Sequence, residues 1–106
     1  MKRIDLSQNV VLQLESIFSN YPEIEKVIVF GSRAIGNAKP GSDIDLAFVG
    51  KKLTVRKVSE IRDYLENETL FPWFFDCVHF ESLQNAALRE HIKKYGLVIY
   101  TSSLNS

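Results

Sequence analysis

Short apolar runs alternate with longer segments of helical periodicity along this chain. Four runs rich in Val, Ile, Leu and Phe predict buried strands, at residues 26–30, 43–49, 74–80 and 97–100. Three segments repeat apolar side chains at helical spacing, at residues 7–19, 55–69 and 83–95. The resulting order, α-β-β-α-β-α-β, predicts an α/β (α+β) fold in which helices flank a mixed β-sheet.

Polar residues and glycines mark where these elements begin and end. Thr54 and Ser82 precede the second and third helical segments, and we expect each to cap its helix. Gly96 follows the last helical segment and is expected to end it. Two glycines and a proline predict a turn or loop from Ala34 to Ser42.

The length and charge of the chain limit the kinds of function it can have. With 106 residues, it is long enough for a single domain over residues 1–106. Lys and Arg together number 13, as do Asp and Glu, so the formal net charge is zero. A protein that holds long nucleic acid through its phosphates normally carries a basic surplus. The balance therefore favours a small charged substrate at one local site, or a protein partner.

Cysteine content and hydropathy indicate the cellular setting. The single cysteine, Cys77, excludes an internal disulfide and a zinc site built from several cysteines. No apolar run approaches the roughly 20 residues needed to span a bilayer. The N-terminal residues also lack the apolar stretch of a signal peptide. We therefore expect a cytoplasmic protein with no membrane association.

Two aspartates stand at the start of the second predicted strand. Because side chains alternate along a strand, Asp43 and Asp45 project from the same face. Like charges about 4 Å apart repel by on the order of 4 kcal/mol at an effective dielectric constant of 20, and a divalent cation removes that repulsion. Hard carboxylate oxygens suit Mg²⁺ or Mn²⁺. The alternative is a pair of exposed aspartates where a loop meets a strand.

A Gly-Ser pair closes the first predicted strand. Gly31 and Ser32 can turn the chain into a short helix, where backbone N–H groups and the Ser32 hydroxyl suit phosphate oxygens. A glycine lets the backbone approach a ligand closely. Arg33 adds a planar donor group that also suits phosphate. An ordinary turn and a surface ion pair are the alternatives for these residues.

A third aspartate lies inside the third apolar run. Asp76 is flanked by Phe74, Phe75, Cys77 and Val78. Burying a carboxylate in such surroundings is costly unless the group is paired or binds a metal ion. A structural partner such as an arginine is the alternative to a metal.

These motifs together resemble a known signature. Gly31-Ser32, ten intervening residues and Asp43-Ile44-Asp45 are similar to the GS-x10-DxD signature of the minimal nucleotidyltransferases, which belong to the DNA polymerase β-like nucleotidyltransferase superfamily. The resemblance extends over nearly the whole chain, because a later apolar strand bearing Asp76 and a closing helix and strand follow in the same order. One departure is Ile35, where many relatives place a basic residue.

The resemblance implies a nucleotidyltransferase fold and a two-metal reaction. Asp43, Asp45 and Asp76 would be the catalytic residues and would hold two Mg²⁺ ions, or Mn²⁺. The nucleoside triphosphate would be bound by the residues around the two turns, which are Gly31, Ser32, Arg33 and Ser42. ATP would be the donor, and AMP would move to an acceptor hydroxyl while pyrophosphate leaves.

The resemblance also implies a protein partner. Family members of this size are similar to the antitoxin half of toxin–antitoxin pairs, whose toxin is a small helical HEPN-domain ribonuclease. The acceptor would then be a tyrosine of a HEPN-domain protein encoded nearby, held in a hetero-oligomer. The alternative is a non-enzymatic antitoxin that neutralises its partner by binding.

A run of apolar residues from 70 to 75 is longer than one strand face can bury. We expect Phe74 and one or two of the others in the core, and the alternative for Trp73 or Phe71 is a place at an interface or against a nucleobase. His91 is expected to be a packing residue of the last helix. Cys77 is expected to point into the core, away from the face that bears Asp76.

Overall fold

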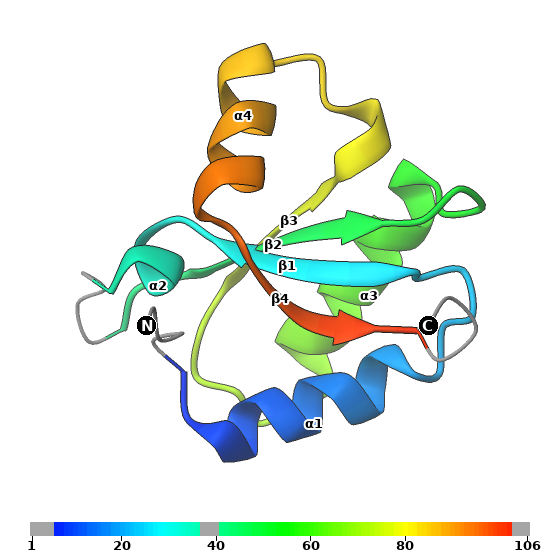
Figure 1. Cartoon of the computed structure of the whole chain (residues 1–106). Coiled ribbons are helices and arrows are strands. Elements are labelled where there is room, and N and C mark those ends of the chain that lie inside the picture. Colours follow the sequence, from blue (N-terminus) through cyan, green and yellow to red (C-terminus); the bar gives the residue numbers. More distant parts are fainter. Residues whose placement is uncertain (1–5, 37–40, 103–106) are drawn as a thin grey trace.

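Helices cover both faces of a four-stranded sheet in the computed structural model, which describes residues 6–36 and 41–102 (Figure 1). The helices are α1 (Gln8–Phe18), α2 (Ser32–Ile35), α3 (Val55–Asn67) and α4 (Ala86–Tyr95), with a short 3₁₀ helix, η1 (Phe80–Ser82). The strands are β1 (Lys26–Phe30), β2 (Ile44–Val49), β3 (Phe75–His79) and β4 (Leu97–Thr101). Within the described ranges, no helix is long and apolar enough to cross a membrane.

The strands lie in the order β3-β2-β1-β4 and pair in two ways. β1 pairs antiparallel with β2 and with β4, whereas β2 and β3 run parallel. α3 makes the crossover connection that a parallel pair requires. The predicted mixed sheet with flanking helices is confirmed, and each of the four predicted strands is correct to within one residue at either end.

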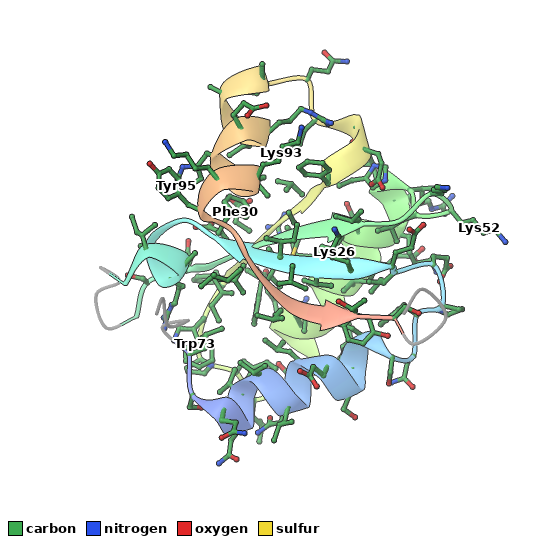
Figure 2. All side chains as sticks on the ribbon, in the orientation of Figure 1. Lys26, Phe30, Lys52, Trp73, Lys93 and Tyr95 are labelled. Carbon is green, nitrogen blue, oxygen red and sulfur yellow. The ribbon has the colours of Figure 1, made fainter. Side chains whose placement is uncertain are left out.

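The main core lies between one face of the sheet and helices α1 and α3 (Figure 2). Ile44, Leu46 and Phe48 alternate along β2 and are fully buried on this face, as the strand pattern predicts. The ring of Phe18 from α1 meets that of Phe48 edge-on, with centroids 5.4 Å apart. Full burial of such side chains stabilises the fold by about 1.5–3 kcal/mol each.

The other face of the sheet is covered less completely. Ile92 of α4 packs on Phe30 and Ala47, and this second cluster is much smaller than the main core. Asp45 stands between Ile44 and Leu46 on β2, so its side chain points toward this second face. Charged groups at one end of this face therefore stay accessible beside α4.

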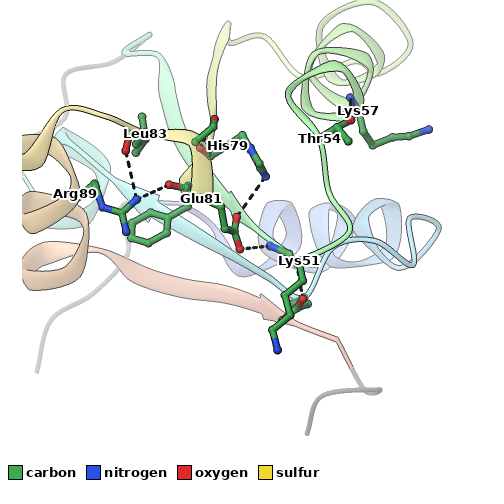
Figure 3. A network of polar contacts seen from close by, with 11 residues as sticks. Lys51, Thr54, Lys57, His79, Glu81, Leu83 and Arg89 are labelled. Carbon is green, nitrogen blue, oxygen red and sulfur yellow. Dashed lines mark hydrogen bonds and ion pairs between the residues drawn. The ribbon is translucent and has the colours of Figure 1, made fainter.

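A polar network fixes α4 and η1 to the end of the sheet (Figure 3). The carboxylate of Glu81 in η1 accepts a hydrogen bond of 2.9 Å from the backbone N–H of Gly50, just after β2. Arg89 of α4 donates to the carbonyl groups of Phe80 (2.9 Å) and Leu83 (3.4 Å). These bonds hold α4 in one position over the sheet.

Two of the three expected helix boundaries are confirmed and one is wrong. The hydroxyl of Thr54 accepts from the N–H of Lys57 at 3.1 Å, and Gly96 follows the last residue of α4. Ser82, however, does not cap α4, because it lies in η1 and donates to the carbonyl of His79. The cap is Asn85, whose side chain accepts from the N–H of Leu88 at 3.1 Å.

Two further expectations need correction. Ala34 and Ile35 belong to the short helix α2 and not to a loop, while residues 37–40 of the expected loop lie outside the described residues. Phe74, expected in the core, is 70% exposed. Phe71 and Trp73 instead pack against the main core, with their rings stacked on each other at 6.1 Å.

Replacing Asn85 by Ala is expected to lower the free energy of unfolding by about 1 kcal/mol, because the first turn of α4 loses its cap. Ser82→Ala is the matched control and is expected to change it by less than about 0.5 kcal/mol, since Ser82 is exposed and outside α4. Urea denaturation of both variants measures the difference. An equal loss in the two variants would contradict the assignment of Asn85 as the cap.

Candidate active site

Three carboxylates meet at one end of the sheet, on the face that α4 partly covers. Asp45 lies directly opposite Asp76 in the parallel register of β2 and β3, where neighbouring strands are about 4.8 Å apart. Asp43 precedes β2 and is two residues from Asp45, hence on the same face. The structure thus places Asp76 beside Asp45, with Asp43 two residues before Asp45 in the chain.

The electrostatics of Asp45 reflect this crowding. Its pKa is raised to about 6, first by partial burial and then by the charges of Asp76 and Asp43. Both effects disfavour the ionised form of the carboxyl group. A cation placed among the three groups would favour the ionised form again.

Asp76 is exposed, contrary to the expectation that the apolar strand buries it. β3 is an edge strand, and the side chains on either side of Asp76, Phe75 and Cys77, are the ones that pack on the main core. The cost of burial therefore does not explain Asp76. Its position beside Asp45, at an edge open to solvent, is the feature that points to chemistry.

Gly31 is required by the geometry around Asp45. Its φ angle is +73°, which side-chain-bearing residues rarely adopt, and a Cβ atom at this position would overlap Oδ2 of Asp45. The carbonyl of Gly31 also accepts from the N–H groups of Ala34 and Ile35, which starts α2. Ser32, partly buried, is the first residue of that helix.

Arg33 links α2 to the residue that precedes the aspartate pair. Its guanidinium is buried, donates a 2.7 Å hydrogen bond to the carbonyl of Ser42 and lies 5.2 Å from the centre of the Trp73 ring. These contacts position the segment leading into β2. Binding of phosphate by Arg33 or Ser42 stays a prediction.

His91 is a packing residue, as expected, and it also lies in this region. Its ring meets that of Phe30 edge-on at 6.5 Å, and its charge lowers the pKa of Asp45 against the larger opposing effects. Phe30 is itself opposite Asp45 in the register of β1 and β2. No spacing in the sequence signals this placement, because it depends on how α4 is docked.

The chemistry of the three carboxylates fits a divalent cation with oxygen ligands, such as Mg²⁺ or Mn²⁺. In the described part of the chain, no three His, Cys, Asp or Glu side chains are gathered closely enough to hold a metal ion as they stand. Binding would therefore require the carboxylates to turn toward one another. The repulsion that raises the pKa of Asp45 is the effect that such an ion would relieve.

Solved structures with the same fold include proteins from toxin–antitoxin complexes. One is a toxin–antitoxin with AMP-PNP, 22% identical, with a TM-score of 0.71 over 94% of this chain and 77% of that one. Another contains a tri-AMPylated Shewanella oneidensis HEPN toxin in complex with MNT antitoxin, at 18% identity and a TM-score of 0.69 over 94% and 76%. A third is a putative nucleotidyltransferase from Sulfolobus solfataricus, at 21% and 0.53 over 87% and 77%.

The family comparison is more specific than these structural likenesses. No significant match was found among curated proteins. The model of the polymerase beta nucleotidyltransferase family matches residues 12–105, which include Gly31, Ser32 and all three aspartates. The chain therefore belongs to the polymerase β nucleotidyltransferase family.

Proposed function

We propose that this chain transfers AMP from ATP to a hydroxyl group of a HEPN-type partner protein, with Mg²⁺ or Mn²⁺ held by Asp43, Asp45 and Asp76. The observation that carries the proposal is the parallel register of β2 and β3, which sets Asp76 beside Asp45. Asp43 lies on the same face, and the charges of both neighbours raise the pKa of Asp45. Family membership supports the reaction class.

The three aspartates differ in exposure, which suggests different roles. Asp45 is half-buried and confined by Gly31, so it would hold a cation together with Asp43. Asp76 is exposed at the sheet edge, where an acceptor can approach, and would orient the hydroxyl and take its proton. Bound divalent ions would neutralise phosphate charge and make the hydroxyl more acidic.

The transfer itself forms one bond and breaks one. The acceptor oxygen attacks the α-phosphorus, the bond from that phosphorus to the bridging oxygen breaks, and pyrophosphate leaves. Ser32 would donate its hydroxyl hydrogen to a triphosphate oxygen. Arg33 would keep the segment before Asp43 in place through the Ser42 carbonyl. The protein thus contributes mainly positioning and charge stabilisation.

Two observations support a protein acceptor, a tyrosine of the HEPN partner in our proposal. The zero net charge gives no basic surplus for long nucleic acid. The similar solved structures include a toxin–antitoxin with AMP-PNP and an AMPylated HEPN toxin bound to an MNT antitoxin. We infer the same kind of hetero-oligomer here.

A non-enzymatic antitoxin that neutralises its partner by binding is the second candidate. Leu70 is fully exposed and Phe74 is 70% exposed, and Phe74 lies two residues from Asp76. Exposed apolar side chains of this size suit a protein contact. Such a contact serves either function, so the distinction requires a measurement of transfer.

Intact-mass measurement tests the proposal with ATP, Mg²⁺ and a HEPN-domain protein from the same source, with a neighbouring gene for such a protein as the first candidate. We expect the partner to gain one or more AMP units, and Asp43→Asn with Asp45→Asn to abolish the gain. Asp76→Asn should slow transfer by at least about 100-fold while ATP affinity stays within about tenfold. Tight binding that inactivates the partner without any gain in mass would instead support neutralisation by binding.

Replacing Gly31 by Ala is expected to impair binding of Mg-ATP, because the new methyl group displaces the Asp45 carboxylate. Gly36→Ala is the matched control, since Gly36 also has a positive φ angle but a Cβ atom there meets nothing within 4 Å. Gly36→Ala should lose about 1 kcal/mol of stability through backbone strain. Gly31→Ala should lose more, because a φ of +73° with a ψ of −152° lies in a region almost confined to glycine. Only Gly31→Ala should lose the rise in melting temperature with Mg-ATP, and the same loss in both variants would contradict this role of Gly31.

Asp45→Asn is expected to change how stability depends on pH when EDTA removes divalent ions. Because folding raises the pKa of Asp45 from 3.8 to about 6, its contribution to stability is full below pH 3.8 and is lost as the pH rises through 6. The parent should therefore become less stable than Asp45→Asn above about pH 6, by about 1 kcal/mol after solvent screening at this half-buried site. Urea denaturation from pH 4 to 7.5 measures the difference, and parallel curves would contradict the expectation.

A further inference from the structure

Three aromatic rings in contact extend from the strand next to the carboxylates to the end of α4. Phe30 lies opposite Asp45 in the β1–β2 register, and the ring of His91 meets that of Phe30 at 6.5 Å. The ring of Tyr95 follows at 5.3 Å from that of His91. His91 and Tyr95 are four residues apart on one helix, so they lie on the same stripe of α4. Figure 2 places Tyr95 near Phe30, where α4 meets the sheet.

This stripe faces the candidate active site. Asp45 lies opposite Phe30, and the ring of Phe30 meets that of His91, so the imidazole is one ring away from the residue opposite the carboxylate. The network around Glu81 and Arg89 fixes the start of α4 to the sheet. The His91–Tyr95 pair lies further along the same helix, next to Phe30.

The other aromatic candidates are placed differently. Trp73 stacks on Phe71, lies against Arg33 and packs on the main core, which is on the opposite face of the sheet. Phe74 is exposed beside Asp76, on the side where the acceptor would approach. Neither ring belongs to the series of contacts that runs from Phe30 through His91 to Tyr95.

We propose that the His91–Tyr95 pair binds the base of the donor nucleotide, an inference that rests on the proposed function. His91 adjoins Phe30, which is opposite Asp45, so a nucleotide with its phosphates at the carboxylates would extend its base toward this pair. Every nucleobase has a π-face that stacks on aromatic side chains, so this contact provides affinity with little discrimination among bases. Lys94 lies over the Tyr95 ring at 5.4 Å, and such an exposed contact is weak enough for a base to displace it.

Calorimetric titration with Mg²⁺ and two probes, ATP and inorganic tripolyphosphate, tests the inference. Tripolyphosphate has no base, so only ATP should be sensitive to the His91–Tyr95 pair. Tyr95→Ala is expected to weaken ATP binding about tenfold and to leave tripolyphosphate binding within about twofold. Tyr95→Phe should bind both like the parent, and Tyr95→Leu, which keeps an apolar side chain in place, should behave like Tyr95→Ala.

A matched control and the contrary outcomes complete the experiment. Tyr64→Ala removes a tyrosine that is 40% exposed on α3, across the sheet, and should bind both probes like the parent. Equal losses for ATP and tripolyphosphate in the Tyr95 variants, or no loss at all, would overturn the base site while sparing the proposed function. A parent that binds tripolyphosphate as tightly as ATP would also overturn it. A parent that binds neither probe would overturn the proposed function and this inference with it.

Discussion

The parallel pairing of β2 with β3 holds two like-charged side chains, Asp45 and Asp76, next to each other, and the rest of the domain makes this arrangement possible. On the opposite face of the same strands, Leu46 and Phe75 are fixed in the main core. Burial of these apolar side chains offsets the local repulsion. The strands therefore cannot shift in register to separate the charges without exposing the core.

Packing also determines the properties of side chains next to the site. Cys77 pairs in register with Leu46 and packs against the main core, as expected from its position in β3. Burial raises the pKa of its thiol far above the ordinary value, so it stays protonated and acts as a small apolar group. Arg33 shows the reverse case, because a charged group is buried, where it donates to the Ser42 carbonyl and lies over the Trp73 ring.

Sequence reasoning succeeded where a local signal decides the outcome. Strand periodicity located β1 and β2, and the Thr54 hydroxyl marked the start of α3. The spacing from Gly31 to Asp43 and Asp45 predicts a carboxylate site, and the role of these residues stays a prediction. Each of these depends on residues close together in the chain. The sequence predicted a mixed sheet but not the order of its strands, because strand neighbours depend on crossover geometry.

The wrong predictions concern residues whose exposure or helix position is determined by tertiary contacts. Asp76 and Phe74 are exposed because β3 is an edge strand, which its apolar composition does not indicate. Ser82 was a plausible cap, but the 3₁₀ helix that includes it moves the start of α4 to Asn85. His91 packs as expected, but its place beside Phe30 and near Asp45 could not be predicted, because these two residues come from strands distant from it in the sequence.

The crossover through α3 gives the carboxylate site one further property. Asp45 and Asp76 are separated in the chain by the whole of that helix and meet only when β3 docks beside β2. The site therefore forms only when the four-stranded sheet is assembled, and no continuous segment of the chain contains it. A proteolytic fragment ending within α3 would keep the glycine turn and both aspartates around β2, yet it would have lost the third carboxylate and the fixed geometry of the other two.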